Sequence, residues 1–218
     1  MTQFEYLHPH SRSGLLRLAE AAEVAGHLGR GSLAILPTET GYLLAALATS
    51  IPATEHAFEV KRRAAAQVMH VACSSLTMAG EAGLLTTRAR RILGEFTPGP
   101  VSVIVPQTDL LPDRLVTLNG TVGLRIPDHP ATLQVISELG QPVTATSLNE
   151  SGSSPGPLDT FDLKSLNWRA DESVYVVVDD GSIRYDAAST LVRVTGADVE
   201  VLRPGPVTDG EIRRAAGG

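Results

Sequence analysis

The sequence has little cysteine, few aromatic residues and almost no lysine. Cys73 is the single cysteine, so an internal disulfide is impossible, and its neighbours (VMHVAC) indicate a buried thiol in a strand. Aromatic residues make up 4% of the chain, so the core must be built mainly from Ala, Val, Leu and Ile. Lys61 and Lys164 are the two lysines, and arginine supplies nearly all of the positive charge.

Long apolar runs are also missing. No segment approaches the length of a membrane span, and the opening MTQFEYLHPHSR lacks the apolar stretch of a signal peptide, so we expect a cytoplasmic protein with no membrane association. The net charge of -6 disfavours general binding to nucleic acid or membrane surfaces but leaves a local basic groove open. With 43% apolar and 19% charged residues, the composition is that of a globular chain.

Helix and strand patterns alternate early and strands dominate the end of the chain. The patterns predict helices at 13–29, 50–63, 86–95, 130–139, 159–166 and 208–216. They predict strands at 32–36, 42–48, 68–73, 101–105, 121–126, 142–146, 174–178, 189–194 and 198–202. We therefore expect one three-layer α/β (α+β) domain, with a twisted mixed sheet flanked by helices. The domain should span 13–207, between an N-terminal tail (1–12) and a C-terminal helix and tail (208–218).

Phosphate-binding and metal-binding motifs of the usual spelling are absent. The chain has no GxxxxGK[ST] and no GxGxxG after a strand. Its six histidines are scattered rather than set at zinc spacing, so the sequence predicts no protein-bound metal site. Any nucleotide chemistry must therefore rest on individual side chains.

Two segments near the N-terminus carry polar or basic clusters. In 37-PTETGY-42, an extended backbone would point Thr38, Thr40 and Tyr42 to one face, while the alternative is a polar hairpin turn. The basic cluster 61-KRR-63 ends a predicted helix, where cations interact favourably with the helix dipole. Each segment taken alone is explained by local structure.

Two later segments place polar groups on core strands. Arg125 interrupts the apolar strand in 123-GLRIPDHP-130, which is unusual for an arginine unless it is paired or functional. The strand at 142–146 ends in hydroxyls, an amide and glycine, with Ser147 and Asn149 on one face if extended. This end is either a surface loop or a loop whose donors face an anionic ligand.

Taken together and in order, these segments resemble the YrdC family, the threonylcarbamoyl-adenylate synthases. The family pattern has PT(D/E)TxYGL, KxR after a helix, PGP before a strand, VGxRxPDHP, TSxNxSG, ST with two hydrophobic residues, and LRPG. The chain has 37-PTETGYLL-44, 61-KRR-63, 98-PGP-100, 122-VGLRIPDHP-130, 146-TSLNESG-152, 189-STLV-192 and 202-LRPG-205. The resemblance covers roughly residues 13–207, with features of the YciO branch in the TGY variant and the opening LHPHS.

The resemblance implies a YrdC-like fold with a concave groove as active site. The implied reaction is that of an L-threonylcarbamoyladenylate synthase, a nucleotidyltransferase. It joins L-threonine, bicarbonate and ATP, with Mg²⁺, and releases pyrophosphate. The product serves tRNA threonylcarbamoyladenosine (t6A) modification, which implies a tRNA threonylcarbamoyl transferase complex as partner and tRNA or double-stranded RNA as a ligand. The alternative is a YciO-like nucleotide- or RNA-binding relative with weak or lost activity; a third is an α/β domain that binds another protein.

The resemblance also implies site residues. Lys61 and Arg63 are the expected catalytic residues, which place positive charge where pyrophosphate leaves. The expected ATP-binding residues are Lys61, Arg63, Ser147, Asn149 and Arg203. The expected threonine-binding residues are Thr38, Thr40, Tyr42, Arg125 and Ser189, with Arg125 holding the carboxylate.

Four features depart from the family pattern, and one of them is Arg193, where an aspartate is expected after STLV. Gly41 and Leu43 flank the tyrosine where the family has an aliphatic residue and a glycine, and Leu43 could keep a ligand from approaching the backbone. Ala64 to Gln67 replace the proline and basic residue that often follow KxR. Some members carry a histidine at the position of Ala72, and here His70 lies two residues earlier on the same strand face.

Overall fold

The fold is taken from a computed structural model of the chain. It describes residues 2–61, 69–112, 116–148, 163–179, 181, 183–196 and 198–217. The predicted residues Arg63 and Asn149 lie outside these ranges.

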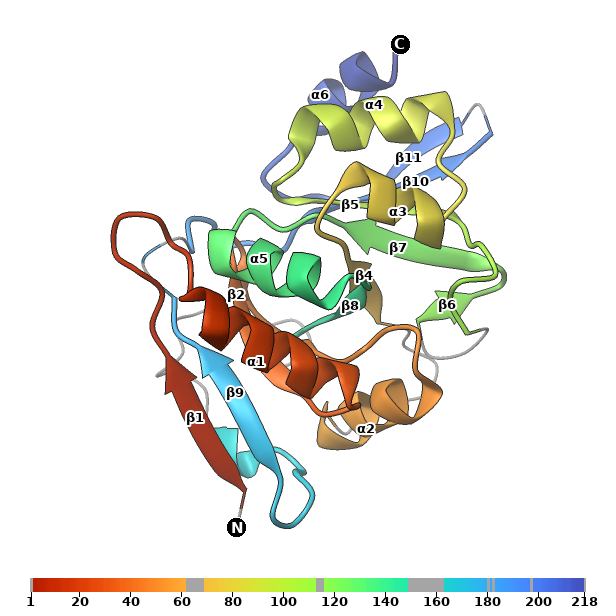
Figure 1. The fold of residues 1–218 in the computed structure, drawn as a ribbon. Coiled ribbons are helices and arrows are strands. Elements are labelled where there is room, and N and C mark those ends of the chain that lie inside the picture. The colour runs from red at the N-terminus through yellow and green to blue at the C-terminus, as the bar shows by residue number, and fades with distance from the viewer. Residues whose placement is uncertain are drawn as a thin grey trace.

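Eleven strands in the described part form one mixed sheet (Figure 1). Their spatial order is β1 (Gln3–Leu7), β9 (Ser173–Val177), β2 (Ala34–Thr38), β3 (Gly41–Ala45), β8 (Val143–Ser147), β4 (His70–Ala72), β7 (Thr121–Arg125), β5 (Val101–Pro106), β10 (Thr190–Thr195) and β11 (Asp198–Arg203). The short β6 (Thr117–Leu118) pairs with β7. Parallel pairs join β1 and β2 to β9, β4 to β7, and β5 to β10, while the other neighbours are antiparallel.

Helices flank this sheet. They are α1 (Leu18–Gly29), α2 (Ile51–Lys61), α3 (Leu76–Ala82), α4 (Thr87–Phe96), α5 (Pro130–Leu139) and α6 (Asp209–Ala216), with a 3-10 turn η2 (Leu163–Ser165). Helices α1 and α5 lie side by side, and α4 lies against α6 (Figure 1). The predicted α/β fold, a twisted mixed sheet flanked by helices, is confirmed. Within the described ranges, every helix is too short or too polar to cross a bilayer.

The N-terminal segment differs from the expected tail. Residues 3–7 form β1, which pairs in parallel with β9 at one edge of the sheet. Leu7 is its single buried side chain, so the strand carries almost no hydrophobic pattern. The sheet therefore begins at Gln3 rather than after residue 12.

The helix predicted at 159–166 is described only in part. Residues 163–165 form the 3-10 turn η2, and residues 159–162 lie outside the described ranges.

The two faces of the central strands differ in polarity. Val103, Val105 and Leu124 are fully buried on one face, and β5 pairs with β7 so that these side chains stack. The end of α3 packs there, because a Cβ at Gly83 would lie 2.6 Å from Val105 Cγ2 and 2.9 Å from Leu124 Cδ1. The opposite face carries the polar and small residues from which the candidate site is built.

Cys73 follows β4 directly and is fully buried, as predicted. Its backbone N–H donates to the Arg125 carbonyl at 2.9 Å. Burial raises the pKa of the thiol to about 12, so it stays protonated and packs as a small apolar group.

Candidate active site

The PTET segment is a tight hairpin turn, which is the second of the two readings of residues 37–42, and the extended run does not form. Strands β2 and β3 pair Thr38 with Gly41, which leaves Glu39 and Thr40 as the turn. Thr38 Oγ1 donates to the Gly41 carbonyl at 2.7 Å and accepts from the Thr40 N–H at 3.2 Å. Gly41 has φ +105°, a conformation that favours glycine, which explains this departure from the family pattern.

Register brings distant residues to one face of the sheet. Cross-strand partners point to the same face, and residues two apart on one strand share it. The register pairs Arg203 with Leu191, Leu191 with Ser102, and Ser102 with Arg125. It continues through Ala72 and Val143 on β4 and β8. Ala145 and Ser147 follow Val143 on the same face of β8. Ala145 pairs with His70 on β4, and Ser147 pairs with Leu43 on β3.

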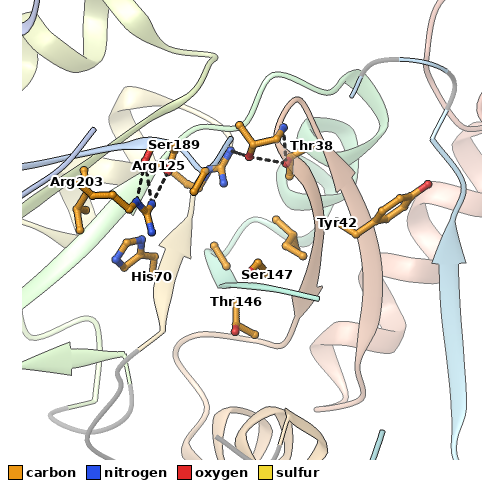
Figure 2. A pocket seen from close by; sticks show the side chains of 13 residues that line it. Thr38, Tyr42, His70, Arg125, Thr146, Ser147, Ser189 and Arg203 are labelled. Atoms are coloured by element: carbon orange, nitrogen blue, oxygen red, sulfur yellow. Dashed lines mark hydrogen bonds between the residues drawn. The ribbon is translucent and has the colours of Figure 1, made fainter. Parts of the chain in front are cut away.

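A cavity of about 170 Å³ opens on this face (Figure 2). Its walls come from the β2–β3 hairpin, β4, β7 and β8, from the start of β10 with the two residues before it, and from the end of β11. Seven predicted site residues line it with their neighbours: Thr38, Thr40, Tyr42, Arg125, Ser147, Ser189 and Arg203. The cavity is smaller than the roughly 300–1,000 Å³ typical for drug-sized ligands, so it suits a molecule the size of an amino acid.

Arg125 and Glu39 form a buried ion pair at one wall of the cavity. Arg125 Nη2 donates to Glu39 Oε1 at 2.7 Å and to Thr40 Oγ1 at 3.2 Å. The exposed fraction of the side chain is 10% for Arg125 and 0% for Glu39. Arg125 Nε is buried, and no acceptor among the described residues takes its proton. Arg125 is therefore paired with a carboxylate through Nη2 and can still donate a hydrogen bond from Nε.

A second guanidinium lies next to it. Arg203 donates to the Ser189 carbonyl from Nε at 3.2 Å and from Nη2 at 2.9 Å. Ser189 Oγ in turn shares a 2.9 Å hydrogen bond with Ser102 Oγ. Burial lowers the pKa of Arg203, and the charge of Arg125 lowers it further. Two cations and one carboxylate thus leave this end of the cavity with a net positive charge, which favours an anion.

Lys61 stands beside the cavity rather than in its wall. It is the last residue of α2, and its Nζ donates to the Leu148 carbonyl at 3.0 Å, next to Ser147. Ser147 is exposed at the end of β8. The two predicted nucleotide contacts therefore come together at one rim of the site.

Tyr42 also lines the cavity, but its ring is turned away from the other predicted residues (Figure 2). Its neighbour in the register is Pro37, on the other face of the hairpin from Thr38. The ring points away from Arg125 (Figure 2), and its hydroxyl accepts from the Asp179 N–H at 2.7 Å. Tyr42 thus borders the cavity, and its hydroxyl ties the chain after β9 to the hairpin.

Sequence reasoning missed Glu39 as a site residue and left His70 undecided. The acid of the PT(D/E)T pattern was the available signal for Glu39. His70 lines the cavity, and its ring lies so close to Gly123 that a Cβ there would be 2.7 Å from His70 Cδ2. Leu43 also lines the cavity, opposite Ser147.

In the described part of the chain, no three His, Cys, Asp or Glu side chains gather where they could hold a metal ion together. The cationic groups at the cavity are suited to anions instead. A divalent cation that arrives with a phosphate ligand would need no cluster of protein ligands.

Gly205 in the LRPG segment lies against the start of β10. A Cβ there would lie 2.4 Å from Thr190 N and 2.6 Å from the Ala188 carbonyl oxygen. We expect Gly205→Ala to lower the free energy of unfolding by about 1–3 kcal/mol, measured by urea denaturation, because backbone must move. The matched control is Gly210→Ala in α6, whose nearest neighbour is 3.6 Å away and whose stability should stay equal or rise by up to about 1 kcal/mol. Equal stability of the two variants would contradict the packing described.

Similarity to known sequences extends over nearly the whole chain. The family model described as telomere recombination, Sua5/YciO/YrdC, matches residues 27–205. A putative threonylcarbamoyl-AMP synthase of Mycobacterium tuberculosis is 34% identical over 193 residues, which is 88% of this chain and 87% of the relative. The uncharacterized protein YciO of Escherichia coli is 25% identical over 206 residues, which is 94% of this chain and 96% of the relative.

Solved structures give the same fold. P. abyssi Sua5 complexed with L-threonine has a TM-score of 0.83 and 25% identity, covering 98% of this chain and 61% of that one. E. coli YciO has a TM-score of 0.79 and 21% identity, covering 97% of this chain and 100% of that one. The chain thus spans less than two thirds of the archaeal protein and the whole of the bacterial one.

Proposed function

Because the chain belongs to the Sua5/YciO/YrdC family, we propose that it forms threonylcarbamoyl-adenylate from ATP, L-threonine and bicarbonate. The observation that carries the proposal is the small cavity with two guanidinium groups, Arg125 and Arg203, on one wall. The likeness to P. abyssi Sua5 complexed with L-threonine and to the 34% identical putative threonylcarbamoyl-AMP synthase of M. tuberculosis supports it.

In this proposal, threonine occupies the cavity. Its carboxylate would accept from Arg125, whose Nε proton is not taken by the described residues. Thr38, Thr40 and Ser189 line the same space and would shape the pocket around the threonine side chain. Tyr42 acts on this pocket through the chain at Asp179, since its hydroxyl is already engaged there.

ATP is too large for the cavity and would extend to the rim formed by Ser147 and Lys61. Lys61 and Arg63 would stabilise the departing pyrophosphate, with Asn149 and Arg203 as further contacts to the nucleotide. Mg²⁺ would enter bound to the phosphates, as part of the substrate.

The bonds balance without a protein-bound intermediate. The threonine amine forms a bond to the carbon of bicarbonate, and one water is lost to give the carbamate. A carbamate oxygen then forms a bond to the α-phosphorus of ATP, while the bond from that phosphorus to pyrophosphate breaks. The protein supplies orientation and positive charge where negative charge moves.

We propose that the product is used in the cytoplasm for t6A modification of tRNA. A tRNA threonylcarbamoyl transferase complex would be the partner that consumes it. Direct binding of tRNA or double-stranded RNA by this acidic chain is a separate proposal, because the two arginines on which the site rests, Arg125 and Arg203, line a small cavity and do not form an extended basic surface.

The test of the function is pyrophosphate release. We expect release from ATP to require both threonine and bicarbonate, and serine to be a poorer substrate. The methyl that distinguishes the two amino acids contributes only about 1–3 kcal/mol, so the preference should be moderate. Release that is independent of threonine and bicarbonate would rule the proposal out.

A second candidate is a YciO-like nucleotide-binding relative without the synthase reaction, and Leu43 is the observation that favours it. Leu43 is buried in the cavity wall opposite Ser147, where the family pattern has glycine. If its bulk limits turnover, Leu43→Gly should raise threonine-dependent release despite a stability cost of at least about 2–5 kcal/mol from the lost core side chain. ATP binding with no threonine-dependent release in either protein would favour the second candidate.

A further inference from the structure

Glu39 is a fully buried carboxylate that contacts three separate parts of the chain. Its Oε1 accepts from Arg125 on β7, and its Oε2 accepts from the Asp128 N–H at 2.7 Å, just before α5. Its backbone carbonyl accepts from the N–H groups of Arg184 and Tyr185 at 2.9 and 3.1 Å. A turn residue with solvent as its only partner would show none of these contacts.

These contacts fix the orientation of the Arg125 guanidinium. Nη2 is shared between Glu39 Oε1 and Thr40 Oγ1, both on the hairpin turn. The Nε proton is not taken by any acceptor in the described ranges, although the atom is buried. A buried donor without an acceptor is costly, so this edge of the guanidinium is suited to an anionic ligand.

The carboxylate also offsets repulsion inside the cavity. Arg125 and Arg203 are both cationic and close enough that the charge of Arg125 lowers the pKa of Arg203. Among the described residues, Arg203 binds the Ser189 carbonyl and hydroxyl rather than a carboxylate. Glu39 is therefore the negative group that lets two guanidinium groups face one small cavity.

The backbone contacts of Glu39 extend its effect to Ser189. The segment 183–189 leaves the hairpin at Arg184 and reaches the cavity at Ala188 and Ser189. Arg184 is held a second time by a side-chain contact with Asp128, whose N–H binds Glu39. One turn residue thus connects Arg125 and Ser189, two of the residues that present donors to the cavity.

We propose that Glu39 is a positioning residue that sets the geometry of Arg125, and through the 183–189 segment that of Ser189, for an amino-acid carboxylate. The ligand rests on the proposed function, whereas the orientation of Arg125 does not. Glu39 itself touches no reacting atom. It acts through the guanidinium that it holds.

The direct test uses Glu39→Gln, which keeps the size of the side chain and removes its charge. Nitrogen-15 NMR of the arginine side chains should show restricted rotation of the Arg125 guanidinium in the wild-type protein and fast rotation in the variant. The matched control is Glu172→Gln, since Glu172 forms a comparably buried pair with His56, with exposed fractions of 8% and 5%. Arg125 should remain restricted in that control.

Threonine binding provides the functional readout. By calorimetry, we expect Glu39→Gln to weaken threonine binding by about tenfold or more, because the carboxylate-binding edge is no longer fixed. Threonine affinity in Glu172→Gln should stay within about twofold of wild type, because Glu172 does not line the cavity. If Glu39→Gln does not fold, Glu39→Asp keeps the charge on a shorter side chain, and the same loosening of Arg125 is expected.

The outcomes separate the two claims. An Arg125 guanidinium that is as restricted in a folded Glu39 variant as in wild type overturns the inference. So does unchanged threonine affinity in a variant that has lost only stability. A wild-type protein that binds no threonine refutes the proposed function, and the rotation of Arg125 then still decides the role of Glu39.

Discussion

Arg125→Ala is expected to remove measurable threonine binding and to lower the free energy of unfolding by about 3–5 kcal/mol. The loss of binding follows from the loss of the guanidinium that faces the cavity. The loss of stability has a separate cause: Glu39, whose exposed fraction is 0%, would be left in the interior without the cation that pairs with it. Isothermal calorimetry and urea denaturation measure the two effects independently.

A second substitution distinguishes folding from function in this experiment. Arg125→Ala with Glu39→Gln removes both charges, so the double variant should regain stability relative to Arg125→Ala, while threonine binding stays lost. The control is Arg193→Ala on β10, whose partner Glu200 at 3.3 Å is exposed like itself. An exposed pair contributes about 0–1 kcal/mol, so that variant should resemble wild type in both measurements. Threonine binding by the Arg125→Ala protein would refute the assignment of the carboxylate site.

Lys61→Ala is expected to weaken the binding of ATP with Mg²⁺ by about 10- to 100-fold, the loss of one charge-assisted phosphate contact. Lys61 ends α2 and donates to the Leu148 carbonyl, which places its ammonium group at the rim beside Ser147. Threonine affinity should change much less, because Lys61 is not in the wall of the cavity.

The sequence offers a matched control in its other lysine. Lys164 is exposed on the turn η2, so Lys164→Ala changes the net charge equally without touching the cavity. If both substitutions weaken ATP binding to the same extent, the effect is one of overall charge and Lys61 has no specific contact. If Lys61→Ala lowers only the free energy of unfolding, Lys61 has a structural role, which is to tie the end of α2 to the Leu148 carbonyl after β8.

The sequence predicted well those helices that begin and end at a residue with a strong local preference, such as proline or glycine. The helix at 130–139 has proline in its first turn and glycine at its C-terminal cap, with φ +67°, and the structure gives the same bounds. β1 and α3 have weaker signals. β1 buries one side chain, and the seven residues of α3 begin at the Ser75 cap and end before Gly83. Their positions are set by partners elsewhere in the chain.

The site was predictable where a residue type conflicted with its surroundings. An arginine in an apolar strand indicated Arg125, and the hydroxyls that end β8 indicated Ser147. Glu39 showed no such conflict, because a glutamate between two threonines is typical of an ordinary turn. Its partner Arg125 is distant in the sequence and is brought to it by the order of the strands. The orientation of the Tyr42 ring was hidden for the same reason, because the turn at Glu39 and Thr40 puts it on the opposite face of the hairpin from Thr38.

The pairing of β5 with β10 has a consequence for how the molecule reaches its final form. A ribosome releases Thr38, His70 and Arg125 long before Ser189 and Arg203, so a nascent chain holds one wall of the cavity without the other. Until β10 arrives, the valine-rich β5 is an open sheet edge, which is a site for aggregation. Closing the long loop between these strands has an entropic cost that precedes any gain from pairing. The cationic end of the cavity is therefore completed late in folding, by the same contact that protects β5 from self-association.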